Sequence, residues 1–201
     1  MYNPEHFRET RTDVLHAFID EHPLGALVAQ RADGLGADHV PMLRATLVDG
    51  TTVLRGHVAR ANTLHRDLAA DAPVLVIFSG PQAYITPSWY PSKQEHGRVV
   101  PTWNYSVVHV HGRIRFVDDA TWLQDLVVRL TDRHEAPRPA PWRVSDAPEP
   151  YIERMLAAIV GFEIRIEAIE GKFKQSQNRE ARDRAGVAAG LAREAGAGVT
   201  P

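Results

Sequence analysis

The strongest constraint on the fold of this chain is a strict alternation of apolar and polar residues near its middle. In VHVHGRIRF, residues 108–116, every second side chain is apolar. The apolar set is Val108, Val110, Ile114 and Phe116, and the polar set is His109, His111, Arg113 and Arg115. A period of two is that of a β-strand that buries one face. We therefore expect this stretch to be a strand of a sheet that covers a core.

Further apolar segments predict a protein that is mainly β with flanking helices. We expect strands at 24–30, 39–48, 52–58, 73–80 and 162–170, with a glycine turn at 33–38, the strand at 73–80 buried on both faces and an Asp49-Gly50 hairpin turn. Helical spacing predicts helices at 12–22, 61–70, 118–135 and 149–160, the last ended by Gly161. Strands and helices do not alternate throughout, which disfavours a doubly wound sheet and favours an antiparallel barrel with helices at its edges.

Composition limits the classes of function. The chain has 201 residues, no cysteine and a formal net charge of −2, so disulfides, thiol catalysis and a general attraction to DNA are excluded. No apolar run approaches the roughly 20 residues of a membrane helix, and the first residues are polar. We expect a cytoplasmic protein without a membrane partner, with one domain over residues 1–191 and a disordered Ala/Gly-rich tail over 192–201.

A proline-punctuated stretch between residues 84 and 105 is rich in aromatic residues, which we expect to lie on a loop. Flat apolar side chains beside polar groups could form a slot for a planar ring system. The candidate residues are Ser88, Trp89, Tyr90, Lys93, Thr102, Trp103 and Asn104. Aromatic residues also concentrate in protein interfaces, and a dimer interface that builds the slot would satisfy both interpretations. For Trp89 or Trp103 alone, an ordinary core anchor is the favoured interpretation.

Two further stretches could bind an anion. In HVARAN, a strand turns into a short helix, where His57, Arg60, Ala61 and Asn62 could surround one phosphate. The local pattern alone favours a plain helix cap with an exposed arginine. Near the C-terminus, a polar loop carries Lys174, Gln175, Ser176, Gln177 and Arg179, which could hold a phosphate or the pyrimidine edge of a ring. The alternative is a solvated basic turn.

Histidines are the remaining candidates for chemistry. His109 and His111 share one face of a strand, but no carboxylate stands at a spacing that would complete a metal site, so we expect no metal. No Ser-His-Asp order and no paired carboxylates are present. If the chain is an enzyme, a cofactor must carry the chemistry.

These stretches together resemble the PaiB-type proteins, described as FMN-binding negative transcriptional regulators. The resemblance rests on MYNPEHF, PLGALVA, LRGHVARAN, FSGPQAYITPSWYPSK, VPTWNYSVVHVHGRI, PWRVSDAP, AIVGFEI and GKFKQSQNR, and it runs from Met1 to about Leu191. It implies a split β-barrel of the FMN-binding, pyridoxamine-phosphate-oxidase-like type and a homodimer with FMN between subunits. It also implies that Arg60 and Asn62 occupy the phosphate turn, although Ala61 and Asn62 replace the basic residue common there.

The resemblance leaves the function open between three alternatives. The first is an FMN-binding homodimer with a redox role, as a flavin-dependent oxidoreductase, or a sensory role in negative transcriptional regulation. The second is a regulator with an empty, degenerate flavin site that acts through protein or DNA contacts; nothing in the residues supports direct DNA binding. The third is a haem-binding split barrel that uses His109 or His111.

Overall fold

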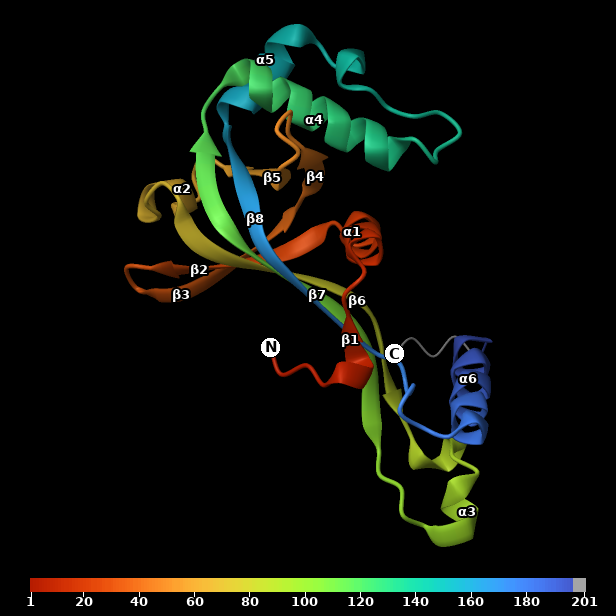
Figure 1. The fold of residues 1–201 in the computed structure, drawn as a ribbon. Helices are drawn as coiled ribbons and strands as arrows, with labels where there is room; N and C mark the ends of the chain where they lie inside the picture. Colours follow the sequence, from red (N-terminus) through yellow and green to blue (C-terminus); the bar gives the residue numbers. More distant parts are fainter. Residues whose placement is uncertain (197–201) are drawn as a thin grey trace. The chain divides into compact units, whose positions relative to one another are not determined.

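The computed structural model describes residues 1–196 and contains a mainly antiparallel sheet with flanking helices (Figure 1). The sheet has eight strands. In spatial order seven of them are β3 (Gly34–Pro41), β2 (Leu24–Arg31), β6 (Ala72–Ile85), β7 (Thr102–Val117), β8 (Ile159–Lys174), β5 (Thr52–Ala59) and β4 (Leu43–Thr46). The two-residue strand β1 (Arg8–Glu9) pairs with β8. The expected fold class is thereby confirmed.

The helices are mostly short. They are α1 (Thr12–Glu21), α2 (Leu64–Asp67), α3 (Ser92–His96), α4 (Ala120–Glu135), α5 (Glu149–Ala157) and α6 (Ala181–Gly196). Three 3-10 turns accompany them, namely η1 (Glu5–Phe7), η2 (Pro87–Trp89) and η3 (Val144–Asp146). The proline-rich stretch before α5 forms no α-helix and no strand, as its prolines predict.

The chain forms two compact units. The first contains Met1–Phe18, Ser79–Val108 and the residues from Glu170 onward, and the second contains Ile19–Phe78 and His109–Ile169. The long strands β6, β7 and β8 contribute residues to both units. The single domain expected over 1–191 stays a prediction.

In the second unit, the strands bury one face. Val110 and Ile114 of β7 are fully buried, as the alternation predicts, whereas Phe116 is half-buried. Phe162 and Ile164 of the neighbouring strand β8 are also fully buried. Burying such a side chain stabilises the fold by about 1.5–3 kcal/mol. This face is the core of the second unit.

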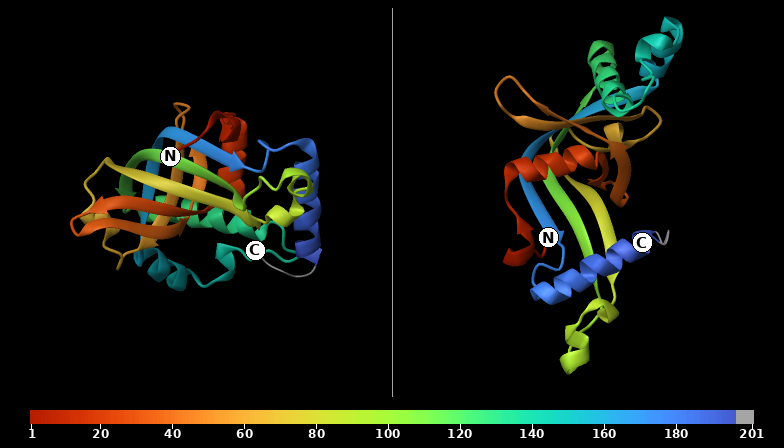
Figure 2. Two further views of the ribbon diagram at one scale, coloured as in Figure 1. Left: turned by 90° about the horizontal axis from the view of Figure 1, so that it is seen from below. Right: turned by 90° about the vertical axis from the view of Figure 1, so that its right-hand side faces the viewer.

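Helix α4 packs through the apolar stripe that its sequence predicts. The Asp119 carboxylate accepts a hydrogen bond from the Trp122 backbone N–H at 2.7 Å and begins the helix. Leu126 and Leu130 then pack against Leu43 of β4. Figure 2 shows α4 and α5 side by side within this unit.

Several predicted boundaries were wrong. Gly161 does not end the preceding helix but lies inside β8. A Cβ there would stand 2.4 Å from the Trp122 ring. The glycine therefore permits close packing of α4 on the sheet. The strand expected at 39–48 is interrupted at Met42, and the expected turn at 33–38 is mostly strand β3. Strand β6 buries alternate residues rather than both faces.

The aromatic stretch and the C-terminal loop also differ from expectation. Trp103 and Tyr105 lie on strand β7 and not on a loop, since the β6–β7 connection ends before Thr102. Lys174 is the last residue of β8, so the polar loop begins at Gln175. Helix α6 includes residues 192–196 of the Ala/Gly-rich tail, and residues 197–201 lie outside the described part of the chain. No helix among the described residues is long and apolar enough to cross a membrane.

Candidate functional site

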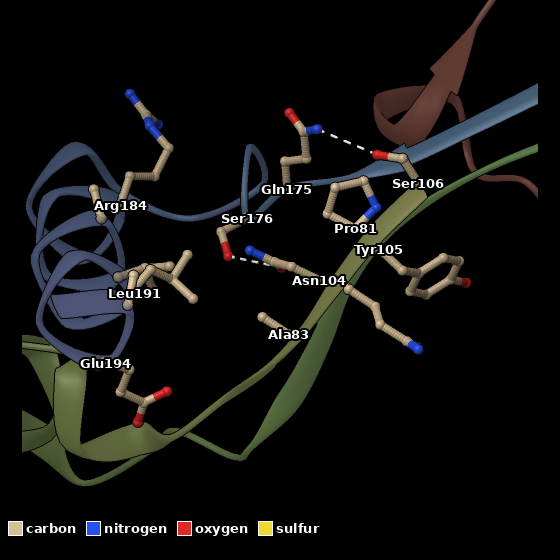
Figure 3. Close-up of a pocket in the computed structure, with 14 residues that line it drawn as sticks. Pro81, Ala83, Asn104, Tyr105, Ser106, Gln175, Ser176, Arg184, Leu191 and Glu194 are labelled. Carbon is tan, nitrogen blue, oxygen red and sulfur yellow. Dashed lines mark hydrogen bonds between the residues drawn. The ribbon is translucent and has the colours of Figure 1, made fainter. Parts of the chain in front are cut away.

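A pocket of about 510 Å³ lies in the first unit, between helix α6 and strands β6 and β7 (Figure 3). Its lining comes from four segments: Pro81, Gln82 and Ala83 of β6; Asn104, Tyr105 and Ser106 of β7; Gln175 and Ser176 of the following loop; and Arg184, Val187, Ala188, Leu191, Glu194 and Ala195 of α6. Ligand pockets typically measure about 300–1,000 Å³. The space is therefore adequate for a small organic ligand.

One wall of the pocket is polar and internally bonded. The Ser176 hydroxyl donates to Asn104 Oδ1 at 3.1 Å, and Gln175 Nε2 donates to the Ser106 hydroxyl at 3.2 Å. Three predicted site residues, Asn104, Gln175 and Ser176, are thus brought together by strand β7 and the C-terminal loop. Amide and hydroxyl groups on one wall can bind the polar edge of a planar ring.

The loop conformation is fixed by its own side chains. Ser176 adopts a φ of 62°, a left-handed conformation that is uncommon for residues other than glycine. The Gln177 amide oxygen accepts from the Gln175 backbone N–H at 2.7 Å, and its nitrogen donates to the Phe173 carbonyl at 2.5 Å. Lys174 donates to the Thr102 hydroxyl. Gln177, Lys174 and Thr102 therefore hold the polar wall in place without lining the pocket.

The opposite wall belongs to α6, which contributes apolar side chains and, in Arg184 and Glu194, two charged ones. Val187 is buried and packs with Ile85 and Tyr90 in a small core cluster. A Cβ on Gly190 would stand 2.2 Å from the Trp89 ring, so the helix lies directly on that tryptophan. Trp89 and Tyr90 thus form the core behind the wall and are not lining residues. Their part in ligand binding stays a prediction.

A buried polar contact fastens the start of α6. The Asp183 carboxylate, 4% exposed, accepts from the Ser92 backbone N–H at 3.2 Å and from the Ser92 hydroxyl at 2.8 Å. Burial raises the pKa of Asp183, but the hydrogen bonds from Ser92 and the charges of Arg182 and Arg179 outweigh burial and lower the pKa. The carboxylate therefore stays ionised and holds α6 against α3.

The other predicted residues of the first unit lie outside the pocket lining. Lys93 lies on α3 and Ser88 lies on η2, and the Lys93 Nζ is 3.4 Å from the Ser88 hydroxyl. The Arg179 guanidinium lies over the Tyr90 ring at 5.0 Å. Trp103 is 50% exposed and meets Tyr84 edge to face at 5.9 Å.

In the second unit, Arg60 is already engaged by protein groups. Its guanidinium donates to both Asp118 carboxylate oxygens at 2.6 and 2.8 Å, to the Ala157 carbonyl at 2.7 Å and to the Ile159 carbonyl at 2.9 Å. The hydrogen bond with Asp118 raises the pKa of Arg60. An arginine has five N–H donors, so four of the five are in use here.

The remaining residues of the predicted phosphate turn differ in their surroundings: Asn62 has structural partners, Ala61 is exposed, and His57 is partly buried. Asn62 Oδ1 accepts from the Leu64 backbone N–H at 2.9 Å, and Asn62 Nδ2 donates to Asp38 at 2.8 Å; Ala61 is exposed. His57 lies opposite Gly161 in the β5–β8 pair, and its Nδ1 is buried without a hydrogen-bond partner among residues 1–196. Burial lowers the pKa of His57, so its imidazole is neutral at pH 7.

The predicted site residues therefore fall into two groups, one in each unit. His57, Arg60, Ala61 and Asn62 belong to the second unit, and all the others belong to the first. That one ligand contacts both groups stays a prediction. Within the described part of the chain, no three His, Asp or Glu side chains are placed to hold a metal ion.

Sequence reasoning missed the α6 lining. Arg184, Val187, Leu191 and Glu194 follow each other at intervals of three and four residues, which puts them on one face of a helix. This signal was present in the sequence. The Ala/Gly content of the segment indicates low complexity and obscures this pattern.

Solved structures identify the fold. The FAD and heme binding protein of Mycobacterium smegmatis matches with a TM-score of 0.63 and 20% identity, covering 91% of this chain and 80% of that one. A flavocytochrome of Azotobacter vinelandii matches with a TM-score of 0.60 and 14% identity, covering 89% of this chain and 75% of that one. The fold is that of the flavin-binding split barrels.

Sequence comparison then gives the family. A family model described as "Putative FMN-binding domain" matches residues 1–168. Protease synthase and sporulation protein PAI 2 of Bacillus subtilis is 33% identical over 183 residues, which cover 91% of this chain and 85% of that protein. An uncharacterized protein of Aspergillus fumigatus is 35% identical over 241 residues, covering 95% of this chain and 92% of that protein. The chain belongs to the PaiB-type FMN-binding family.

Proposed function

We propose that this protein binds FMN as a cytoplasmic homodimer and uses the bound flavin in redox chemistry or in sensing linked to negative transcriptional regulation. The observation that carries the proposal is the match of residues 1–168 to an FMN-binding family in a chain whose first unit holds a suitable pocket. The name of the Bacillus subtilis relative, which refers to protease synthesis and sporulation, supports a regulatory role.

The donor set of the pocket supports a flavin. Asn104, Ser106, Gln175 and Ser176 offer amide and hydroxyl groups to the edge of a ring, while Ala83 and Leu191 offer apolar surface to its face. When bound, the flavin would supply electron and hydride transfer. The residues of this chain would bind the ring, orient it and exclude water from its apolar face.

Other predicted residues are proposed in supporting roles. Lys174, Thr102 and Gln177 would keep the polar wall in position, and Trp89 and Tyr90 would support α6 from behind. Ser88, Lys93, Trp103 and Arg179 in the first unit, and His57, Arg60, Ala61 and Asn62 in the second, remain proposed contacts to the cofactor or across the dimer.

A titration tests the proposal. Protein stripped of ligand should quench FMN fluorescence in a saturable manner, and FMN should raise its melting temperature. The Asn104→Ala change should weaken the affinity for FMN at least about tenfold, since it removes a polar partner of the ring edge. Protein that neither quenches FMN fluorescence nor shifts its melting temperature would exclude the flavin role. A specific gel shift by that flavin-free protein would then support a regulator with an empty site.

Haem is a second candidate ligand. It is favoured by two solved proteins with this fold, an FAD and heme binding protein and a flavocytochrome. Either His109 or His111 on β7 is the proposed axial ligand. A Soret shift during haem titration that the His109→Ala or His111→Ala change removes would support this candidate, and an unchanged free-haem spectrum would exclude it.

A further inference from the structure

A second pocket, of about 670 Å³, lies in the second unit, where helix α4, turn η3 and helix α5 line it. Its lining residues lie between Gln124 and Ile152, a part of the chain that belongs wholly to the second unit. The candidate flavin pocket is lined wholly by the first unit. The two pockets therefore share no residue, and the proposed function uses none of the second one.

The second pocket has an apolar surface built from three elements. Val128 of α4, Val144 of η3 and Ile152 of α5 line it, and each is half-buried. Part of each side chain therefore remains available to a ligand. Because removing apolar groups from water is favourable, this surface favours a ligand that carries apolar groups of its own.

The charged residues of the lining carry both signs. Arg143 contributes a guanidinium, while Asp132 and Glu149 contribute carboxylates, and all three side chains are exposed. Within residues 1–196, no ion pair joins these groups to one another or to a further residue, and the guanidinium donates no hydrogen bond. Opposite charges thus line one cavity without neutralising each other.

Other charged residues nearby are paired within the protein. Arg129 lies 3.6 Å from Asp125 on α4, and Arg138 lies 3.1 Å from Glu135 at the end of that helix. The unpaired charges of the pocket can be satisfied by a ligand that brings a cation to the carboxylates and an anion to the guanidinium. The charges therefore point to a zwitterion.

The backbone that carries the guanidinium is fixed by reciprocal hydrogen bonds. The Arg143 backbone N–H donates to Asp146 Oδ2 at 2.9 Å, and the Asp146 backbone N–H donates to the Arg143 carbonyl at 2.9 Å. This turn holds its shape without a ligand. A preformed wall lowers the entropy that binding must remove.

We propose that the second pocket binds a short apolar peptide with free termini. The peptide carboxylate accepts hydrogen bonds from Arg143, its ammonium group pairs with the carboxylates of Asp132 and Glu149, and its side chains lie on Val128 and Ile152. A pocket of this size accommodates a drug-sized molecule, which is larger than one free amino acid. The inference does not rest on the proposed function, because no residue of the flavin pocket takes part.

The test is calorimetry with the dipeptide leucyl-leucine and with two forms of it that each lack one charge, the C-terminal amide and the N-acetyl derivative. We expect one dipeptide to bind per chain, and each blocked form to bind at least about tenfold more weakly. R143Q should weaken the dipeptide at least about tenfold but leave the affinity for the amide unchanged, because the amide has no carboxylate. D132N combined with E149Q should weaken the dipeptide but leave the N-acetyl form unchanged.

R138Q and E153Q are the matched controls. Arg138 follows α4 and pairs with Glu135, Glu153 lies on α5, and neither lines the pocket, so both variants should bind the dipeptide like the wild type. Because Arg143 is exposed, R143Q should fold like the wild type, which circular dichroism will verify. FMN titration of R143Q measures flavin binding separately and should match the wild type.

Three results would overturn the inference. They are a wild type that binds no leucyl-leucine at millimolar concentration, an R143Q variant that binds it as tightly as the wild type, and an equal loss of affinity in R138Q and R143Q. Free leucine that binds as tightly as the dipeptide would overturn the peptide as the occupant. None of these results bears on FMN binding, so the proposed function stands or falls by its own titration.

Discussion

At the residue scale, the most consequential buried charge is Glu163 of β8. Its side chain is 5% exposed and accepts hydrogen bonds from Arg55 at 2.8 Å and from Arg115 at 2.7 and 2.9 Å. Arg55 in turn lies 5.5 Å from the Trp122 ring. One carboxylate thereby ties strands β5, β7 and β8 to helix α4. Such a buried pair is costly to break, since removing one partner leaves charges without compensation.

We predict that Glu163→Gln lowers the free energy of unfolding by about 2–3 kcal/mol. This loss is smaller than the largest losses known for broken buried ion pairs, because the side chain of Arg115 is more than half exposed. Glu167→Gln is the control. Glu167 also pairs with an arginine, Arg113, but it is 44% exposed, so its loss should cost at most about 1 kcal/mol. Urea unfolding of both variants measures the difference. Equal effects would contradict the structural role given to Glu163.

His57 gives a pH dependence with a defined sign. Burial lowers its pKa in the folded state below the unfolded value of about 6.5, so the unfolded state binds more protons. Stability from this residue is complete above pH 6.5 and is lost as the pH falls below that value. We predict that the free energy of unfolding falls less between pH 7.5 and 5.5 in His57→Gln than in the wild type. Parallel curves would show that His57 does not contribute.

At the scale of elements, helix α6 depends on glycines that let it approach η2. A Cβ on Gly186 would lie 2.0 Å from the Trp89 carbonyl oxygen, and one on Gly190 would lie 2.2 Å from its ring. Distances below 3.0 Å require the backbone or the ring to shift. The small residues of this low-complexity segment are therefore a packing surface.

We predict that Gly190→Ala destabilises the docking of α6 by about 1–3 kcal/mol, the usual effect of overpacking. Faster amide hydrogen exchange in residues 184–194 would reveal it. Gly196→Ala is the matched control, because a Cβ there meets nothing within 4 Å and alanine favours a helix. If the two variants exchanged equally, α6 would not depend on its contact with Trp89.

The sequence predicted elements better than connections. Alternation located β7, and helical periodicity with an acidic cap located α4, because in both cases burial of one face dominates. Gly161 was assigned to a helix end because sequence alone cannot distinguish a glycine that terminates a helix from one that admits a tryptophan. The lining of α6 was missed for a similar reason, since its alanines and glycines resemble those of an unstructured tail.

At the scale of the whole molecule, the proposed dimer predicts a role for exposed aromatic residues. Tyr84 is 47% exposed, and its edge-to-face partner Trp103 is 50% exposed; aromatic residues of this kind are enriched in protein interfaces. We predict a dimer in sedimentation experiments, and we expect Trp103→Ala to weaken it by at least about 30-fold, as for a typical interface anchor. A wild-type monomer at micromolar concentration would contradict the dimer.

The family and its fold followed from long sequence motifs, but the site could be predicted only in part. Asn104, Gln175 and Ser176 do meet in one pocket, although they come from segments about 70 residues apart in the chain. The engagement of Arg60 by Asp118 was not visible, because it depends on how two distant segments meet. Tertiary partners of a charged side chain are the property that local sequence patterns reveal least.

The most direct test of flavin binding is the absorption spectrum of the protein purified without added ligand and then titrated with FMN. We predict flavin bands between about 370 and 450 nm in the purified protein, or after titration a saturable, perturbed flavin spectrum at one FMN per chain. A protein that remains colourless and leaves the spectrum of added FMN unchanged would contradict the central claim.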